Sequence, residues 1–211
     1  MKKKYIVLTI LFVLPLVAYL FFASGVNNFA KLPVIKQNVD NISNYTKIGF
    51  DNKISVLIFL GNNINDRQGD ALNLNQKIYK RFYQFNDFQF VVVCPLGSEQ
   101  LAENLKNKLA SGTNTDMINW NFIFLNPELI VKLFKSLKTD NNLDYNYGSP
   151  YVYIIDKKLS QRGRNDNNGI KFGYDSRSVA DINNFMLDDI KVILAEYRLA
   201  LKKNGITRKD L

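Results

Sequence analysis

The 211-residue chain alternates short apolar runs with segments of helical periodicity, and this alternation constrains its fold more than any other feature. Runs such as residues 55–60 and 88–94 have the length of buried strands. Between them, apolar residues recur at steps of three or four, as on the buried face of a helix. The predicted order is β-α-β-α-β-α-β-β-α, which favours parallel βαβ units followed by an antiparallel hairpin. We therefore expect an α/β fold with a central mixed sheet flanked by helices.

Capping residues mark the ends of the predicted helices. Ser98 begins one helix, Asn126 followed by Pro127 begins another, and Ser178 with Asp181 resembles a capping box. The predicted strands cover residues 55–60, 88–94, 119–125, 149–156 and 159–164, and the predicted helices cover residues 69–86, 98–111, 126–137 and 178–204.

The chain has no histidine, and Cys94 is its single cysteine. These absences exclude Ser-His and Cys-His catalysis, histidine-ligated metal sites, an intrachain disulfide and a CxxC redox pair. We therefore expect neither a cofactor nor an enzymatic activity.

The N-terminal segment combines a basic start with a long uncharged run. Lys2, Lys3 and Lys4 contribute to a net charge of +9, and the other basic residues are scattered, so no nucleic-acid partner is expected. As a helix, the uncharged residues 5–23 would span about 28 Å, close to the thickness of a bilayer core. Residues 1–25 are therefore predicted to form an uncleaved membrane anchor. The small residues at positions 23–25 leave a cleaved signal peptide as the alternative.

An N-terminal segment of this kind predicts that the rest of the chain is exported. The positive-inside rule places the N-terminus in the cytoplasm and the C-terminal part outside the cytoplasmic membrane, in a periplasmic or other extracytoplasmic space. Residues 26–47 are predicted to be a linker with one edge strand or hairpin, residues 48–204 a single domain, and residues 205–211 a basic tail.

Three stretches of the domain resemble a known family. They are SVLIFLGNN from Ser55, NWNFIFLNPELIVKLFKSL from Asn119, and SPYVYIIDKKLSQRGR from Ser149. Together with the N-terminal segment, they are similar to the thioredoxin-like fold and to its SCO-like family of membrane-anchored copper-delivery proteins of cytochrome oxidase assembly. The resemblance implies that the loop at residues 61–70 faces Pro150 and that the bond before Pro150 is cis. An ordinary trans proline at a strand start is the alternative.

The residues that bind copper in the SCO-like family are missing from this chain. That family has a CxxxC pair in the loop after the strand that matches residues 55–60, and a histidine near the closing hairpin. The corresponding loop here reads GNNINDRQGD. We therefore predict a degenerate member without copper or redox residues, which acts as a non-catalytic binding or scaffold protein of the cell envelope.

The predicted binding groove joins the 61–70 loop to the segment before the fourth strand, and its expected occupant is an envelope protein of unknown identity. Asp66 and Asp70 lie four residues apart, which would suit a hard cation, but capping of the next helix is the favoured interpretation. No metal site is predicted. The candidate groove residues are Asn62, Asn63, Asp66, Arg67, Ser149 and Pro150.

Cys94 is the candidate thiol for an alternative function, a thiol- or metal-handling protein related to respiratory oxidase assembly. It ends an apolar strand, where sites of α/β proteins gather. A reactive thiol needs exposure and a lowered pKa, so a small core residue is the favoured interpretation. Arg162 and Arg164 alternate along the last strand and are predicted to line a solvated edge.

Overall fold

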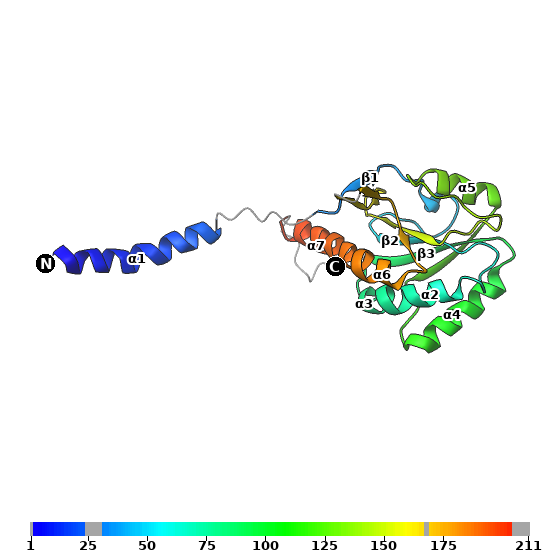
Figure 1. Cartoon of the computed structure of the whole chain (residues 1–211), viewed down its shortest axis with the longest axis horizontal. Coiled ribbons are helices and arrows are strands. Elements are labelled where there is room, and N and C mark those ends of the chain that lie inside the picture. Colours follow the sequence, from blue (N-terminus) through cyan, green and yellow to red (C-terminus); the bar gives the residue numbers. More distant parts are fainter. Residues whose placement is uncertain (1, 24–30, 167–168, 204–211) are drawn as a thin grey trace. The chain divides into compact units, whose positions relative to one another are not determined.

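The computed structural model describes residues 2–23, 31–166 and 169–203 (Figure 1). The chain forms two units, Met1–Ala30 and Lys31–Leu211. The first contains helix α1 (Lys2–Ala23). In the part of the chain that the structure describes, no helix combines the length and apolar character needed to cross a membrane, which takes about 20 apolar residues. The predicted membrane anchor is therefore not supported.

The second unit is built on a mixed sheet with the strand order β1-β6-β5-β2-β3-β4. Strands β2, β3 and β4 run parallel, whereas β5, β6 and β1 are joined by antiparallel pairing. A short β9 also pairs with β5, and β7 and β8 form a separate hairpin. This order and these directions are those of a thioredoxin-like fold. The bounds are β1 (Val34–Lys36), β2 (Ile54–Phe59), β3 (Phe88–Pro95), β4 (Trp120–Leu125), β5 (Tyr151–Ile155), β6 (Gln161–Arg162), β7 (Arg164–Asp166), β8 (Gly169–Lys171) and β9 (Tyr174–Asp175).

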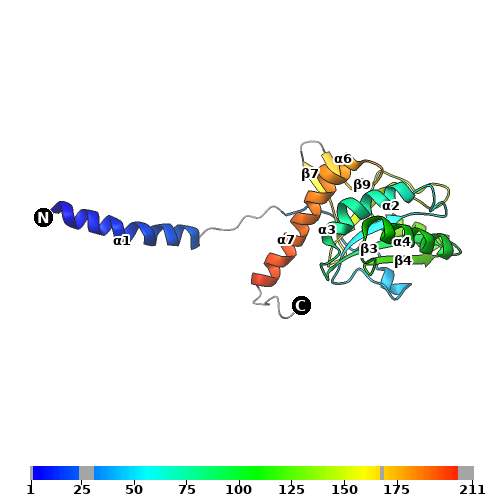
Figure 2. The same cartoon turned by 90° about the horizontal axis from the view of Figure 1, so that it is seen from below.

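Helices cover both faces of this sheet (Figures 1 and 2). One face carries α2, α4 and α7 with the short helices that continue them, and the other carries α5. Two helical segments are π-helical. Segment η2 lies between α2 and α3, and η3 lies between α6 and α7. The bounds are η1 (Ile42–Asn44), α2 (Gln68–Leu74), η2 (Asn75–Tyr79), α3 (Lys80–Phe82), α4 (Glu99–Thr113), α5 (Pro127–Lys135), α6 (Val179–Asp181), η3 (Ile182–Met186) and α7 (Leu187–Lys203).

The central strand β2 is apolar along its length because both of its faces are buried. Val56 and Ile58 pack into the core beneath α2 and α7, whereas Leu57 and Phe59 pack into the core beneath α5. A strand with two buried faces shows no alternation of polar and apolar residues. The continuous run predicted this strand correctly, and the same reasoning holds for β3.

The compact unit begins earlier than the predicted domain. Residues 31–47 were expected to be a linker with an edge strand or hairpin, and β1 is indeed an edge strand that pairs with β6. However, Leu32, Val39 and Ile42 are buried in the cores of the unit. Residues 26–30 and the predicted tail at 205–211 lie outside the described residues.

The prediction of a cis bond before Pro150 is wrong, because none of the described peptide bonds is cis. The trans form is the lower-energy default, and local hydrogen bonds accommodate it. Ser149 N–H donates to the carbonyl of Phe59 at 2.9 Å. The carbonyl of Pro150 accepts from the N–H and the hydroxyl of Ser176, at 2.9 and 2.6 Å.

The prediction of a solvated arginine edge is also wrong, because β1 covers β6 and removes the edge. Arg162 is only 3% exposed. Its guanidinium lies 2.9 Å from a carboxylate oxygen of Asp156 and 2.6 Å from one of Glu196. It also donates to the carbonyl of Leu32 at 2.8 Å. Arg164 pairs with Asp189 at 2.7 Å. Arg162 thus joins the β5–β6 hairpin, the last helix and the start of the compact unit.

Replacing Arg162 with alanine should destabilise the protein strongly. Arg162→Ala leaves the buried carboxylate of Asp156 without its cation, which typically costs about 3–5 kcal/mol in the free energy of unfolding. Urea denaturation of the two proteins measures this loss. Arg177→Ala is the matched control, because it breaks the exposed pair with Asp175 and should cost at most about 1 kcal/mol. Equal losses in the two variants would contradict the prediction.

Candidate functional site

The structure brings the 61–70 loop and the segment at residues 144–150 together at the end of β2. Leu60 and Gly148 form an isolated antiparallel bridge. The N–H of Asn62 donates to the carbonyl of Asn146 at 2.9 Å. The loop that follows β2 therefore lies directly beside the chain that leads into β5. We call this surface, residues 61–70 with residues 144–150, the loop surface.

Two glycines permit the close approach of these segments. Gly61 has a φ of +70°, and a Cβ built there would lie 2.4 Å from the carbonyl oxygen of Asn146. A Cβ on Gly148 would lie 2.7 Å from Nε of Arg67. Any larger residue at either position would push the two segments apart.

An ion pair between Arg67 and Asp144 links the two segments. The guanidinium donates to one carboxylate oxygen of Asp144 at 2.6 Å. The other oxygen accepts from the N–H groups of Asn146 and Gly148, both at 2.8 Å. Burial acts to raise the pKa of Asp144, but the hydrogen bonds from Gly148, Arg67 and Asn146 outweigh it and hold the pKa below its ordinary value. The carboxylate is thus ionised and fixed.

A second carboxylate, Asp70, lies near the same arginine in the first turn of α2. It is 3.7 Å from the guanidinium of Arg67. Burial raises the pKa of Asp70, while the positive charges of Arg67 and Arg177 oppose this effect in part. Arg177 is itself paired with Asp175 at 2.7 Å. The start of α2 therefore lies in a cluster of positive and negative side chains.

The residues predicted for the groove differ in accessibility. Asn62, Asn63 and Asp66 are exposed, Arg67 and Pro150 are half-buried, and Ser149 is buried. Of these predicted residues, the side chains available to a partner are therefore those of the 61–70 loop, and Tyr145 of the adjacent segment is 88% exposed as well.

The predicted capping of the second helix by an aspartate is not found. The residue before α2 is Arg67, and no side chain forms a capping hydrogen bond there. Within the described residues, no group of three or more Cys, Asp and Glu side chains is arranged to hold a metal ion.

Sequence reasoning missed the contributions of Asp144, Asn146 and Gly148. Asp144 and Asn146 lie far along the chain from the 61–70 loop, in a stretch rich in Asn, Asp and Tyr without periodicity. Only the fold of the sheet brings this stretch beside the loop. The pair of an aspartate at 144 and a glycine four residues later is a local turn signal, but it does not indicate which arginine the aspartate meets.

Cys94 is a core residue at the end of β3. It is fully buried and belongs to the core cluster that also contains Val92 and Ala102. Burial raises the pKa of its thiol to about 12, although a hydrogen bond with Ser98 acts in the opposite direction. A thiol in this setting is protonated and shielded, which favours the structural interpretation.

Comparisons with known proteins give structural likenesses only. No protein-family model matches the chain, and no curated protein matches it. Among solved structures, it is similar to a putative protein disulfide isomerase from Bacteroides thetaiotaomicron, with 10% identity, coverage of 79% of this chain and 95% of that one, and a TM-score of 0.49.

Two solved SCO proteins are similar as well. A SCO1/SenC family lipoprotein from Bacillus anthracis shares 21% identity over 83% of this chain and 99% of that one, with a TM-score of 0.43. BsSco, a member of the Sco family of cytochrome c oxidase assembly proteins, shares 14% identity over 77% of this chain and 94% of that one, with a TM-score of 0.46. Identities of this size relate folds and transfer no activity. The thioredoxin-like fold of this chain rests on its own strand order and strand directions.

The thiol of Cys94 should resist modification in the native protein. A thiol reagent at about pH 8 needs the thiolate and access to the sulfur, and burial withholds both. Labelling should be negligible in buffer and complete after denaturation, as measured by absorbance or mass. Ser111→Cys places a thiol on the exposed side of α4 and should label rapidly in the native state. Comparable native rates at the two positions would refute the prediction.

Asp144 and Asp70 should affect stability with opposite pH dependences. The pKa of Asp144 is below its ordinary 3.8, so its contribution is present above that pH and is lost as the pH falls through the lower native value. The pKa of Asp70 is raised, so its contribution is present below 3.8 and is lost as the pH rises through the native value.

At neutral pH, we expect Asp144→Asn to lower the free energy of unfolding by up to about 1 kcal/mol and Asp70→Asn to raise it slightly. Urea denaturation at about pH 7 and about pH 3 measures both changes, and the Asp144→Asn difference should shrink at the lower pH. A stabilising Asp144→Asn at neutral pH would show that the ion pair with Arg67 is unfavourable.

Proposed function

We propose that this chain is a non-catalytic protein-binding domain of thioredoxin-like fold, and that its partner docks on the loop surface. One observation carries this proposal. In the loop after the central strand, where the resemblance to the SCO-like family would place a cysteine pair, the Arg67–Asp144 ion pair ties the loop to the segment before β5. The position is held by a structural link, and the exposed side chains around it are amides, carboxylates and the phenol of Tyr145, which is 88% exposed.

The residue content supports a binding role over catalysis. The chain has no histidine. Its single thiol, at the end of β3, is buried. The raised pKa of Cys94 disfavours the alternative of a thiol- or copper-handling protein, because Cu(I) and disulfides both react with thiolates.

The chemistry of the loop surface favours a polar protein partner. Asn62 and Asn63 expose amide groups that donate and accept hydrogen bonds, and Asp66 adds a negative charge. Such groups suit a rim of hydrogen bonds to a folded or extended polypeptide. We further propose, from the basic and apolar N-terminal segment alone, that the domain is exported and meets its partner in the cell envelope.

A photo-crosslinking residue at Asn63 tests the docking surface. We expect it to capture one protein reproducibly in cells that express the full chain, as identified by mass spectrometry. The same residue at Lys36, which is exposed on β1 at the far edge of the sheet, is the control and should not capture that protein. Asn62→Asp should reduce capture at Asn63, because it replaces an amide donor of the same surface with a carboxylate.

Two outcomes would contradict the proposal. Capture of the same proteins from Asn63 and Lys36 would indicate non-specific contact. A redox or copper-transfer activity that is lost in Cys94→Ser, with the fold intact by circular dichroism, would restore the alternative function.

A further inference from the structure

Strand β4 forms one edge of the sheet, and among the described strands it pairs with β3 alone. The carbonyls of Asn119 and Leu125 accept hydrogen bonds from the side of β3. The N–H and C=O groups of successive residues point to opposite sides along a strand. Those of Phe122 and Phe124 therefore point away from β3, to the open side of the edge. An edge of this kind is a template for a further strand.

The edge lacks the features that normally prevent strand pairing. Protected edges carry charged residues, prolines or bulges, whereas β4 reads WNFIFL and keeps a regular register with β3. Phe122 and Phe124 are half-buried. Ile118, just before the strand, is 74% exposed. The edge therefore presents apolar side chains together with backbone groups that have no partner among the described residues.

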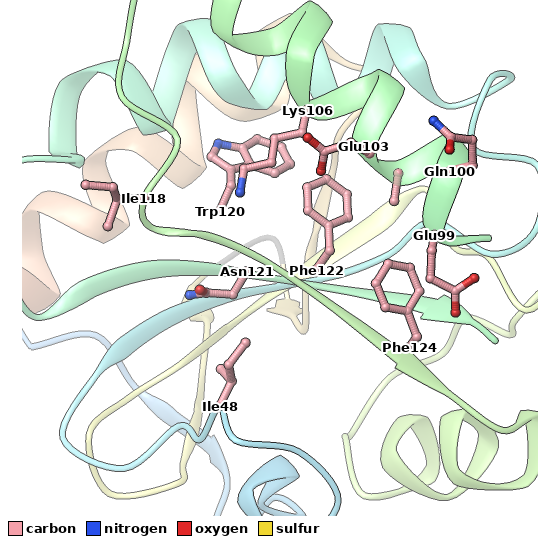
Figure 3. Close-up of a pocket in the computed structure, with 11 residues that line it drawn as sticks. Ile48, Glu99, Gln100, Glu103, Lys106, Ile118, Trp120, Asn121, Phe122 and Phe124 are labelled. Carbon is pink, nitrogen blue, oxygen red and sulfur yellow. The ribbon is translucent and has the colours of Figure 1, made fainter. Parts of the chain in front are cut away.

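A groove of about 520 Å³ runs along this edge, between β4 and α4 (Figure 3). Figure 3 shows Phe122 on the side of the strand that faces α4, and Ile48 on the opposite side. The charged residues of α4 follow the groove in order, with Lys106 beside Trp120 and Glu99 beside Phe124. The groove therefore has a positive end and a negative end, with aromatic rings along its floor.

We propose that β4 pairs antiparallel with β4 of a second copy of this chain, around a two-fold axis at Phe122. This register places the half-buried Phe122 opposite Phe122 of the second copy, so these two rings meet on one face. Trp120, which is 1% exposed and packed in its own core, lies opposite Phe124 of the second copy in register only. The N–H of each Phe122 donates to the carbonyl of the other. A two-fold interface uses the same patch twice, and the aromatic pattern of β4 is symmetric about Phe122.

The charges of α4 favour a second copy over an unrelated strand. The same two-fold axis brings the two α4 helices together in opposite directions, so Lys106 of each copy faces Glu99 of the other. In the described part of the chain, neither side chain forms an ion pair, although Glu99 accepts a hydrogen bond from the N–H of Gly97. Glu103 lies near the axis, so Glu103 of each copy faces Glu103 of the other. The groove is thus complementary to itself, independently of what binds the loop surface.

Sedimentation velocity of the 211-residue chain over a range of concentrations tests the dimer. We expect a reversible monomer–dimer equilibrium. Phe122→Lys places two ammonium groups at the axis and should raise the dissociation constant by about tenfold or more. Val34→Lys is the matched control, because it makes the same kind of change at an exposed position on the opposite edge strand. Circular dichroism shows whether each variant is folded.

Charge reversal tests the register without disturbing the core. Glu99→Lys and Lys106→Glu should each weaken the dimer by about three- to tenfold, and the double variant should recover the original affinity. Glu103→Gln should tighten the dimer, because it removes a like-charge contact. A chain that stays monomeric, a dimer insensitive to Phe122→Lys, or a double variant that fails to recover would overturn the proposal.

Discussion

The buried guanidinium of Arg162 joins parts of the molecule that are distant in sequence. It bonds Asp156 at the turn of the β5–β6 hairpin, Glu196 on α7 and the carbonyl of Leu32 at the start of the compact unit. A buried charge is tolerated only when partners satisfy it, so these three segments must assemble together. The antiparallel half of the sheet and the last helix are thereby fixed to each other.

This half of the sheet determines where the loop surface lies. Strand β5 pairs with β2, and the chain that leads into β5 passes beside the end of β2. Arg67 from the loop meets Asp144 from this chain, and the absence of a Cβ on Gly61 and Gly148 makes the approach possible. The surface thus depends on the close approach of two backbone segments and on one ion pair. Cys94 contributes to the core instead, as a packing residue.

The two edges of the sheet differ in a way that bears on association. On one side, β1 covers β6 with an irregular register and ends in an exposed lysine. On the other side, β4 is regular, uncharged and bordered by a groove with opposite charges at its ends. The two surfaces that we propose for partners are therefore the loop surface at the end of β2 and the aromatic edge of β4.

The sequence by itself determined the α/β class, the parallel core, the closing hairpin and the lack of histidine and of a cysteine pair. Those features depend on local periodicity, on capping residues such as Ser178, and on residue types that are simply missing. Tertiary structure decided the rest: the burial of Arg162, the trans bond before Pro150, the incorporation of residues 31–47 and the pairing of Arg67 with Asp144. Each of these depends on contacts between segments far apart in the chain, and periodicity carries no information about which distant segment a residue will meet.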